Sequence, residues 1–148
     1  MSKTIKSLQE QPQTEKMTKE RLRSYTFLVK EIEAQKERLA QLEASLLYPQ
    51  QSIGDGVPRS KFATDRMATL IANKVALEEA IMENIAKAQK EAAAIEKAIQ
   101  TLKEPIDREL MRLKYLYGLT WEEVAERLER SRQWITVLHG RILQKLNK

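Results

Sequence analysis

Apolar residues recur every three or four positions over two long stretches of the chain, which is the spacing of one face of an α-helix. From about residue 18 to 47 the apolar positions follow a heptad pattern in which Gln35 fills one place. They are Tyr25, Leu28, Ile32, Leu39, Leu42 and Leu46. A second series of apolar positions extends from about residue 61 to 103 and is interrupted by Lys74. It comprises Met67, Leu70, Leu77, Ile81, Ile85, Ala88, Ala92, Ile95, Ile99 and Leu102. The two series predict long helices that pack as a coiled coil.

Proline and glycine interrupt the pattern at about residues 48–60, where a loop is expected. We therefore predict an antiparallel coiled-coil hairpin over residues 18–104, in which Thr18 caps the first helix. At 1.5 Å per residue the helices would be roughly 45 and 65 Å long. The second would extend beyond the first and leave the seam from about Ala92 to Leu102 without an intramolecular partner. We expect a homodimer through the coiled coil to cover this seam.

Beyond residue 104 the pattern changes to three short amphipathic helices. The first begins at Pro105, which suits the first turn of a helix, and Gly118 supplies a left-handed stop. Thr120 and Glu123 have the spacing of a capping box, and Ser131 is the N-cap expected for the third helix. The expected inward faces are Ile106, Leu110, Leu113 and Tyr117, then Trp121, Val124, Ala125 and Leu128, then Ile135, Leu138, Ile142 and Leu146. Helices this short depend on mutual packing, so residues 105–148 are predicted to form one small helix-turn-helix domain.

The outward face of the third helix carries side chains that suit contact with DNA. Arginine can bridge two acceptors of guanine and glutamine can bridge adenine, while threonine and valine can meet the methyl group of thymine. Residues near the start of a recognition helix usually make such contacts. The expected base-contacting residues are Arg132, Gln133, Thr136 and Val137. The expected contacts with the DNA backbone come from Arg112, Lys114, Arg127, Arg130, Ser131, His139, Arg141 and Lys145.

The charge distribution agrees with binding of a polyanion. The chain carries a net charge of +5. Residues 105–148 hold nine Lys/Arg and six Asp/Glu, and residues 127–148 hold six basic residues with Glu129 as the one acid. Such a local excess supports salt-dependent DNA binding.

Other classes of function find little support in the sequence. The chain has no cysteine and one histidine, so we expect no thiol chemistry, no metal, no cofactor and a reducing cytoplasm. Glu122, Glu123 and Glu126 suit the start of a helix through its dipole, and no enzymatic activity is expected. No apolar run approaches the about 20 residues that cross a bilayer, so no membrane contact is expected. Residues 1–17 are polar and aperiodic and are predicted to form a disordered tail.

The C-terminal residues resemble region 4 of bacterial sigma factors, the helix-turn-helix that contacts the −35 element of promoters. The matching positions are Leu110, Leu113–Tyr115, Gly118–Ala125, Leu128, Ser131 and His139–Leu143. The whole chain resembles small phage and prophage proteins with such a C-terminus, among them the ArpU-like regulators. Glu129 departs from the family pattern, which often has glycine in this turn. A non-glycine residue there costs about 1 kcal/mol if its backbone is left-handed.

The resemblance implies a sequence-specific transcription regulator of phage or prophage genes that binds double-stranded DNA in a bacterial host cell. A chain of 148 residues is not expected to hold the separate promoter-melting domain of a sigma factor. Contact with host RNA polymerase is compatible with the resemblance, and no residue requires it. Two alternatives stay open: a phage DNA-packaging protein of the small-terminase kind, and a coiled-coil adaptor that does not bind DNA.

Overall fold

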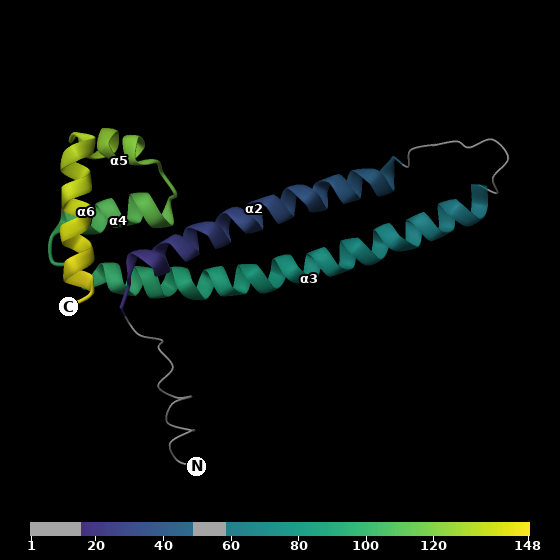
Figure 1. Ribbon diagram of the computed structural model, residues 1–148, viewed down its shortest axis with the longest axis horizontal. Coiled ribbons are helices and arrows are strands. Elements are labelled where there is room, and N and C mark those ends of the chain that lie inside the picture. The colour runs from purple at the N-terminus through teal and green to yellow at the C-terminus, as the bar shows by residue number, and fades with distance from the viewer. Residues whose placement is uncertain (1–15, 49–58) are drawn as a thin grey trace, which may run out of the picture. The chain divides into compact units, whose positions relative to one another are not determined.

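The computed structural model describes residues 16–48 and 59–148, whose helices are labelled in Figure 1. These residues divide into two compact units. We call them the hairpin unit, residues 27–48 and 59–89, and the terminal unit, residues 16–26 and 90–148. Neither described range contains a β-strand. The predicted all-α fold is confirmed.

Two long antiparallel helices contribute to both units. They are α2 (Lys19–Leu47) and α3 (Arg59–Gln100). In the terminal unit the guanidinium of Arg21 donates to the carboxylate of Glu91 at 2.7 Å, and in the hairpin unit the amide of Asn84 donates to Gln35 at 3.0 Å. Because the residue number rises along α2 as it falls along α3, the helices run in opposite directions, as predicted.

The start of α2 is part of the packed structure. The hydroxyl of Thr18 accepts a hydrogen bond from the N–H of Arg21 at 3.2 Å, which confirms the predicted cap. Met17, which we assigned to the tail, is 2% exposed and belongs to the core of the terminal unit. The rest of the predicted tail, residues 1–15, and the loop residues 49–58 lie outside the described residues.

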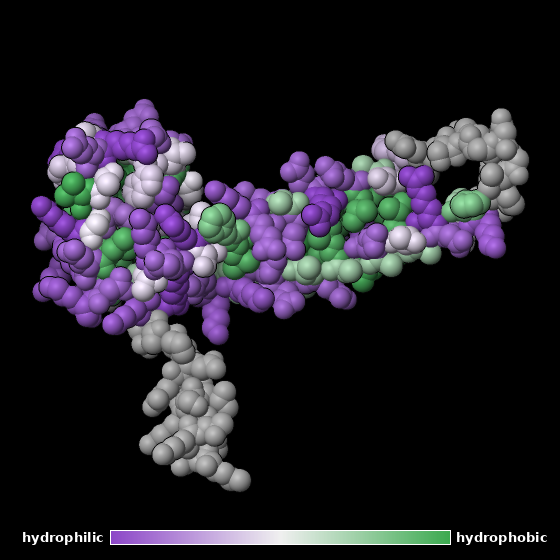
Figure 2. All heavy atoms as spheres, viewed as in Figure 1, coloured by the Kyte–Doolittle hydropathy of each residue, from purple (hydrophilic) through white to green (hydrophobic). Residues whose placement is uncertain are grey.

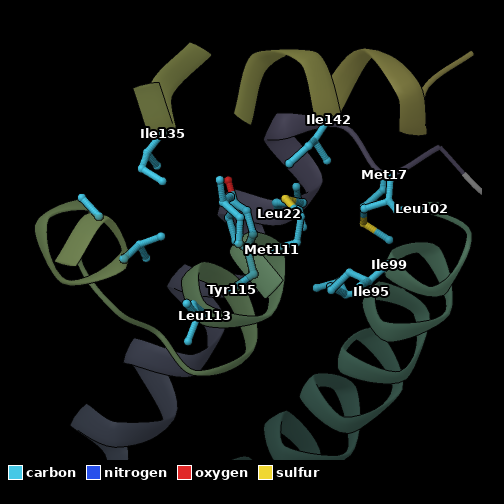
Figure 3. Close-up of a cluster of buried hydrophobic side chains, with 13 residues drawn as sticks. Met17, Leu22, Ile95, Ile99, Leu102, Met111, Leu113, Tyr115, Ile135 and Ile142 are labelled. Atoms are coloured by element: carbon cyan, nitrogen blue, oxygen red, sulfur yellow. The ribbon is translucent and has the colours of Figure 1, made fainter. Parts of the chain in front are cut away.

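Four short elements complete the terminal unit. They are α4 (Pro105–Met111), the π-helical turn η1 (Arg112–Leu116), α5 (Trp121–Leu128) and α6 (Arg132–Leu146). One apolar cluster joins them to the ends of α2 and α3 (Figure 3). Its buried members are Met17, Leu22, Ile95, Ile99, Leu102, Leu110, Met111, Leu113, Tyr115, Val124, Ala125, Ile135 and Ile142. The short helices thus share a single core, as their inward faces predicted.

The end of α3 corrects one prediction. We expected the seam from Ala92 to Leu102 to lack an intramolecular partner, but Ile95 and Ile99 are 0% exposed and Leu102 is 5% exposed. The start of α2 and the short helices cover these side chains in the core of the terminal unit (Figure 3). The estimate from helix lengths was wrong because it compared the two long helices alone and left out the domain that follows them.

The π-helical turn changes which tyrosine faces the core. The N–H of Tyr117 donates to the carbonyl of Arg112, five residues earlier, at 2.9 Å. A turn with this wider spacing no longer places residues four apart on one face. Tyr117, which we expected to point inward, is therefore 68% exposed, while Tyr115 is 8% exposed.

Candidate nucleic-acid interface

The first helix of the candidate helix-turn-helix, α5, begins with the predicted capping box. The hydroxyl of Thr120 accepts from the N–H of Glu123 at 3.2 Å, and the carboxylate of Glu123 accepts from the N–H of Thr120 at 2.9 Å. The backbone hydrogen bond from Thr120 is the main reason why the pKa of Glu123 is lowered. Gly118, just upstream, has φ 71°, which confirms the predicted left-handed stop. Local hydrogen bonds thus fix the entry into α5.

The turn between α5 and α6 passes through a left-handed residue. Glu129 has φ 55° and ψ 44°, and it is the one non-glycine residue with positive φ in the described ranges. The N–H of Arg130 donates to the carbonyl of Ala125 at 3.0 Å and closes the turn. The hydroxyl of Ser131 then accepts from the N–H of Trp134 at 3.1 Å, so Ser131 caps α6 as predicted. Glu129 thus adopts a left-handed backbone that glycine, which has no Cβ, adopts without steric cost.

One face of α6 packs inward and the opposite face is exposed. Ile135 and Ile142 are 0% exposed in the core. The four residues that we expected to contact bases are all exposed: Arg132, Gln133, Thr136 and Val137. The hydroxyl of Thr136 donates to the carbonyl of Arg132 at 3.0 Å. This bond uses the hydroxyl hydrogen of Thr136 and leaves its methyl group for apolar contact.

Arg132 forms an ion pair with the preceding helix. Its Nη1 donates to Oε1 of Glu122 on α5 at 2.6 Å. The side chains are 62% and 64% exposed. An exposed pair of this kind contributes little to stability, about 0–1 kcal/mol. Its consequence is the orientation of the guanidinium at the start of α6.

Three of the arginines that we expected at the DNA backbone are exposed around the same helices. Arg127 lies in the last turn of α5, Arg130 in the turn, and Arg141 on α6. The guanidinium of Arg130 lies over the ring of Trp134, 5.1 Å from its centre. These cations can approach a polyanion without losing a buried partner.

Two other cations that we expected at the DNA backbone form ion pairs within the terminal unit. Arg112 donates to both carboxylate oxygens of Glu96, the shortest contact being 2.7 Å from Nη2, and this hydrogen bonding raises the pKa of Arg112. Lys145 donates at 2.7 Å to Asp107, whose side chain is 2% exposed. Each cation is paired with a carboxylate of the terminal unit. Neither Arg112 nor Lys145 can therefore bind a phosphate without breaking an ion pair.

Lys114 and His139 also make contacts within the terminal unit. The ammonium of Lys114 lies over the ring of Trp121, 4.5 Å from its centre, and donates to the carbonyl of Leu119 at 3.3 Å. His139 is 7% exposed, and its Nε2 lies 2.7 Å from the hydroxyl oxygen of Tyr115. A phosphate contact from this buried ring is inconsistent with its position, so the expected role of His139 is corrected to packing.

Burial keeps the Tyr115–His139 pair uncharged. Desolvation raises the pKa of Tyr115 to about 12. It also lowers the pKa of His139 to about 4, with smaller contributions from the positive charges of Lys19 and Lys114. Trp121 packs edge-on against the imidazole, with ring centres 4.7 Å apart. The pair connects η1 to the buried face of α6 and so supports the orientation of the opposite, exposed face.

Several acids that hold basic side chains of the terminal unit left no direct signal in the sequence. Glu96, Asp107 and Glu122 hold Arg112, Lys145 and Arg132, respectively. Each partner lies at least ten residues away in the chain, outside the spacings that reveal helix pairs. Within the described residues no group of three or more His, Cys, Asp or Glu could hold a metal ion. None of the described helices is long and apolar enough to cross a membrane.

Comparison with known families agrees with this geometry. The family model described as sigma-70, region 4 matches residues 98–148. No significant match was found among curated proteins or solved structures. The matched range begins near the end of α3 and includes α4, η1, α5 and α6. The C-terminal part of the chain is therefore similar to sigma-70 region 4, a family of helix-turn-helix domains that bind DNA and are not enzymes.

Proposed function

We propose that the chain is a sequence-specific transcription regulator of phage or prophage genes that acts in the cytoplasm of a bacterial host. The observation that carries the proposal is the exposed face at the start of α6, on a helix-turn-helix similar to sigma-70 region 4. An α-helix fits the major groove of B-DNA, where each base pair presents a distinct pattern of donors and acceptors. The residues proposed to contact bases are Arg132, Gln133, Thr136 and Val137.

The proposed contacts with the DNA backbone are fewer than the sequence predicted. Arg127, Arg130 and Arg141 stay in the set because they are exposed. Arg112 and Lys145 leave it because carboxylates of the same unit hold them. Each phosphate neutralised by a cation releases counterions and steepens the dependence of affinity on salt. Arg127→Ala should therefore reduce the slope of log affinity against log salt by about 1.

Selection of bound DNA from a random pool tests the proposal. The full chain is expected to enrich one defined motif. Enrichment without any motif would contradict sequence-specific regulation. Ring-shaped oligomers bound to DNA would favour the packaging alternative, and a folded chain that binds no DNA would favour the adaptor.

Self-association through the hairpin stays part of the proposal, although the seam at the end of α3 no longer supports it. Its support is now a row of exposed apolar side chains on α3: Ile71 is 49%, Val75 48% and Met82 71% exposed. Figure 2 shows hydrophobic side chains on the visible face of the hairpin unit. Sedimentation should give a dimer that Val75→Glu weakens, and an inverted repeat in the selected motif would agree. A wild-type monomer at micromolar concentration would contradict it.

Contact with host RNA polymerase is a further prediction from the resemblance to sigma factors. Co-purification of the polymerase with the full chain tests it. The DNA-binding proposal does not depend on the outcome, because the base contacts come from α6 alone.

A further inference from the structure

The ion pair between Glu122 and Arg132 bears on how Arg132 meets DNA, and this inference rests on the proposed function. Glu122 lies in the first turn of α5, and Arg132 is the first residue of α6. Arg132 Nη1 lies 2.6 Å from Glu122 Oε1, which is the one hydrogen bond of its guanidinium within the described residues. The contact therefore ties the expected base-contacting arginine to the helix before it.

The planar geometry of the guanidinium group determines which of its N–H donors remain available when Nη1 is bound to Glu122. An arginine presents its five N–H donors in a rigid planar fork. With Nη1 donated to Glu122, the edge formed by Nε and Nη2 remains available for a second acceptor pair. Two parallel N–H donors match O6 and N7 of guanine. Glu122 thus leaves Arg132 with one edge suited to a bidentate contact with a base.

The charge of Glu122 acts against a phosphate contact by the same arginine. A carboxylate that neutralises the guanidinium removes the counterion-releasing effect of a free cation. It also repels the phosphates of any DNA on which Arg132 finds no guanine. A preorganised side chain, in turn, loses less freedom when it binds. The pair therefore favours one base contact over general attraction to the DNA backbone.

We propose that Glu122 is a positioning residue for sequence recognition: it holds Nη1 of Arg132 and directs the Nε–Nη2 edge to a guanine. Glu122 itself contacts no base. Its effect passes through Arg132 and is a gain in discrimination at one G·C pair.

Matched variants separate this effect from the loss of a negative charge. Glu122→Ala removes the contact, and Glu122→Gln keeps a carbonyl acceptor without the charge. Glu126→Ala is the control, because Glu126 lies one turn further along α5, is exposed, and forms no ion pair within the described residues. Both alanine variants should bind unrelated DNA as tightly as the wild type or more tightly, since each removes a negative charge.

The test compares the affinity of the full chain for the selected duplex with its affinity for the duplex in which the proposed guanine pair is replaced. Arg132→Ala identifies that pair as the one at which it reduces the preference most. Glu122→Ala should reduce the preference by about fivefold or more, the lower end of what a bidentate contact provides. Glu122→Gln should restore part of it, and Glu126→Ala should leave it within about twofold. In the Arg132→Ala background, Glu122→Ala should cause no further loss.

Three results would overturn the proposal while the proposed function stands. One is a preference in Glu122→Ala equal to that in Glu126→Ala. Another is a further loss in the Arg132→Ala background, which would mean that Glu122 contacts a base directly. The third is a dependence of affinity on salt that becomes less steep when Arg132 alone is replaced by alanine. That result would mean that Arg132 contacts a phosphate. A wild-type chain that selects no motif would overturn both this proposal and the proposed function. Circular dichroism checks that each variant is folded.

Discussion

Replacing Glu129 by glycine should stabilise the terminal unit. Glu129 adopts φ 55° and ψ 44°, where the side chain of an L-residue lies too close to the following carbonyl. This conformation costs about 1–2 kcal/mol for a residue with a Cβ. Glycine removes that cost but loses about 0.5–1 kcal/mol because its unfolded chain is freer. Glu129→Gly is therefore expected to raise the free energy of unfolding by about 1 kcal/mol.

Urea unfolding followed by tryptophan fluorescence measures this change. Both tryptophans of the chain, Trp121 and Trp134, lie in the terminal unit, so their emission reports its unfolding. Glu129→Ala removes the same charge and keeps the Cβ, so the difference between the two variants isolates the backbone effect. Glu126→Gly, within the right-handed α5, should instead lower stability by about 1 kcal/mol. Equal stabilities of Glu129→Gly and Glu129→Ala would refute the reasoning.

Three further predictions concern burial. Because burial lowers the pKa of His139 to about 4, below the ordinary value of about 6.5, the unfolded chain binds the proton first as pH falls. The contribution of His139 to the free energy of unfolding should therefore rise between about pH 4 and 6.5 and stay constant above pH 6.5. NMR of this histidine should show a titration midpoint near pH 4. Lys145→Met leaves the buried carboxylate of Asp107 without its cation and should lower the free energy of unfolding by about 1–3 kcal/mol in urea titration; no loss would contradict it. Ile99→Ala should lower it by about 2–5 kcal/mol, whereas Leu47→Ala, at an exposed position outside the apolar row of α3, should change it by less than about 0.5 kcal/mol.

Features that depend on near neighbours in the chain were predictable. The capping box of Thr120 and Glu123 and the cap of Ser131 are closed by hydrogen bonds over three residues. Gly118 adopts the left-handed backbone predicted for it, whereas the conformation of Glu129, left open by the sequence, was settled by the structure. Such features follow from residue type and spacing, because both partners lie within one turn of helix.

Ion pairs between distant residues were not predictable from spacing. Arg112 meets Glu96 and Lys145 meets Asp107 across the packed unit. The sequence shows a basic residue on an outward face but does not show whether a carboxylate of another helix lies opposite. Residue type and spacing therefore predict Arg112 and Lys145 at the DNA backbone, whereas in the structure each is paired with a carboxylate.

The partner of an apolar face was not predictable either. Heptad spacing correctly marked Ile95, Ile99 and Leu102 as residues to be buried. Periodicity identifies the buried face of a helix but leaves open whether another copy or another part of the same chain covers it. Here Met17 and Leu22, at the start of α2, belong to the cluster that covers it.

Base contact from the start of α6 is tested most directly by the affinity of the full chain for its selected duplex relative to a scrambled duplex. Arg132→Ala/Gln133→Ala should reduce that preference by about 30-fold or more, since two bidentate contacts each provide about 1–3 kcal/mol of discrimination. The control is Gln144→Ala/Lys148→Ala, which also removes one amide and one cation, from the last turn of α6 and from just beyond it. This variant should leave the preference unchanged. A folded Arg132→Ala/Gln133→Ala variant that keeps the wild-type preference would contradict DNA recognition by this face.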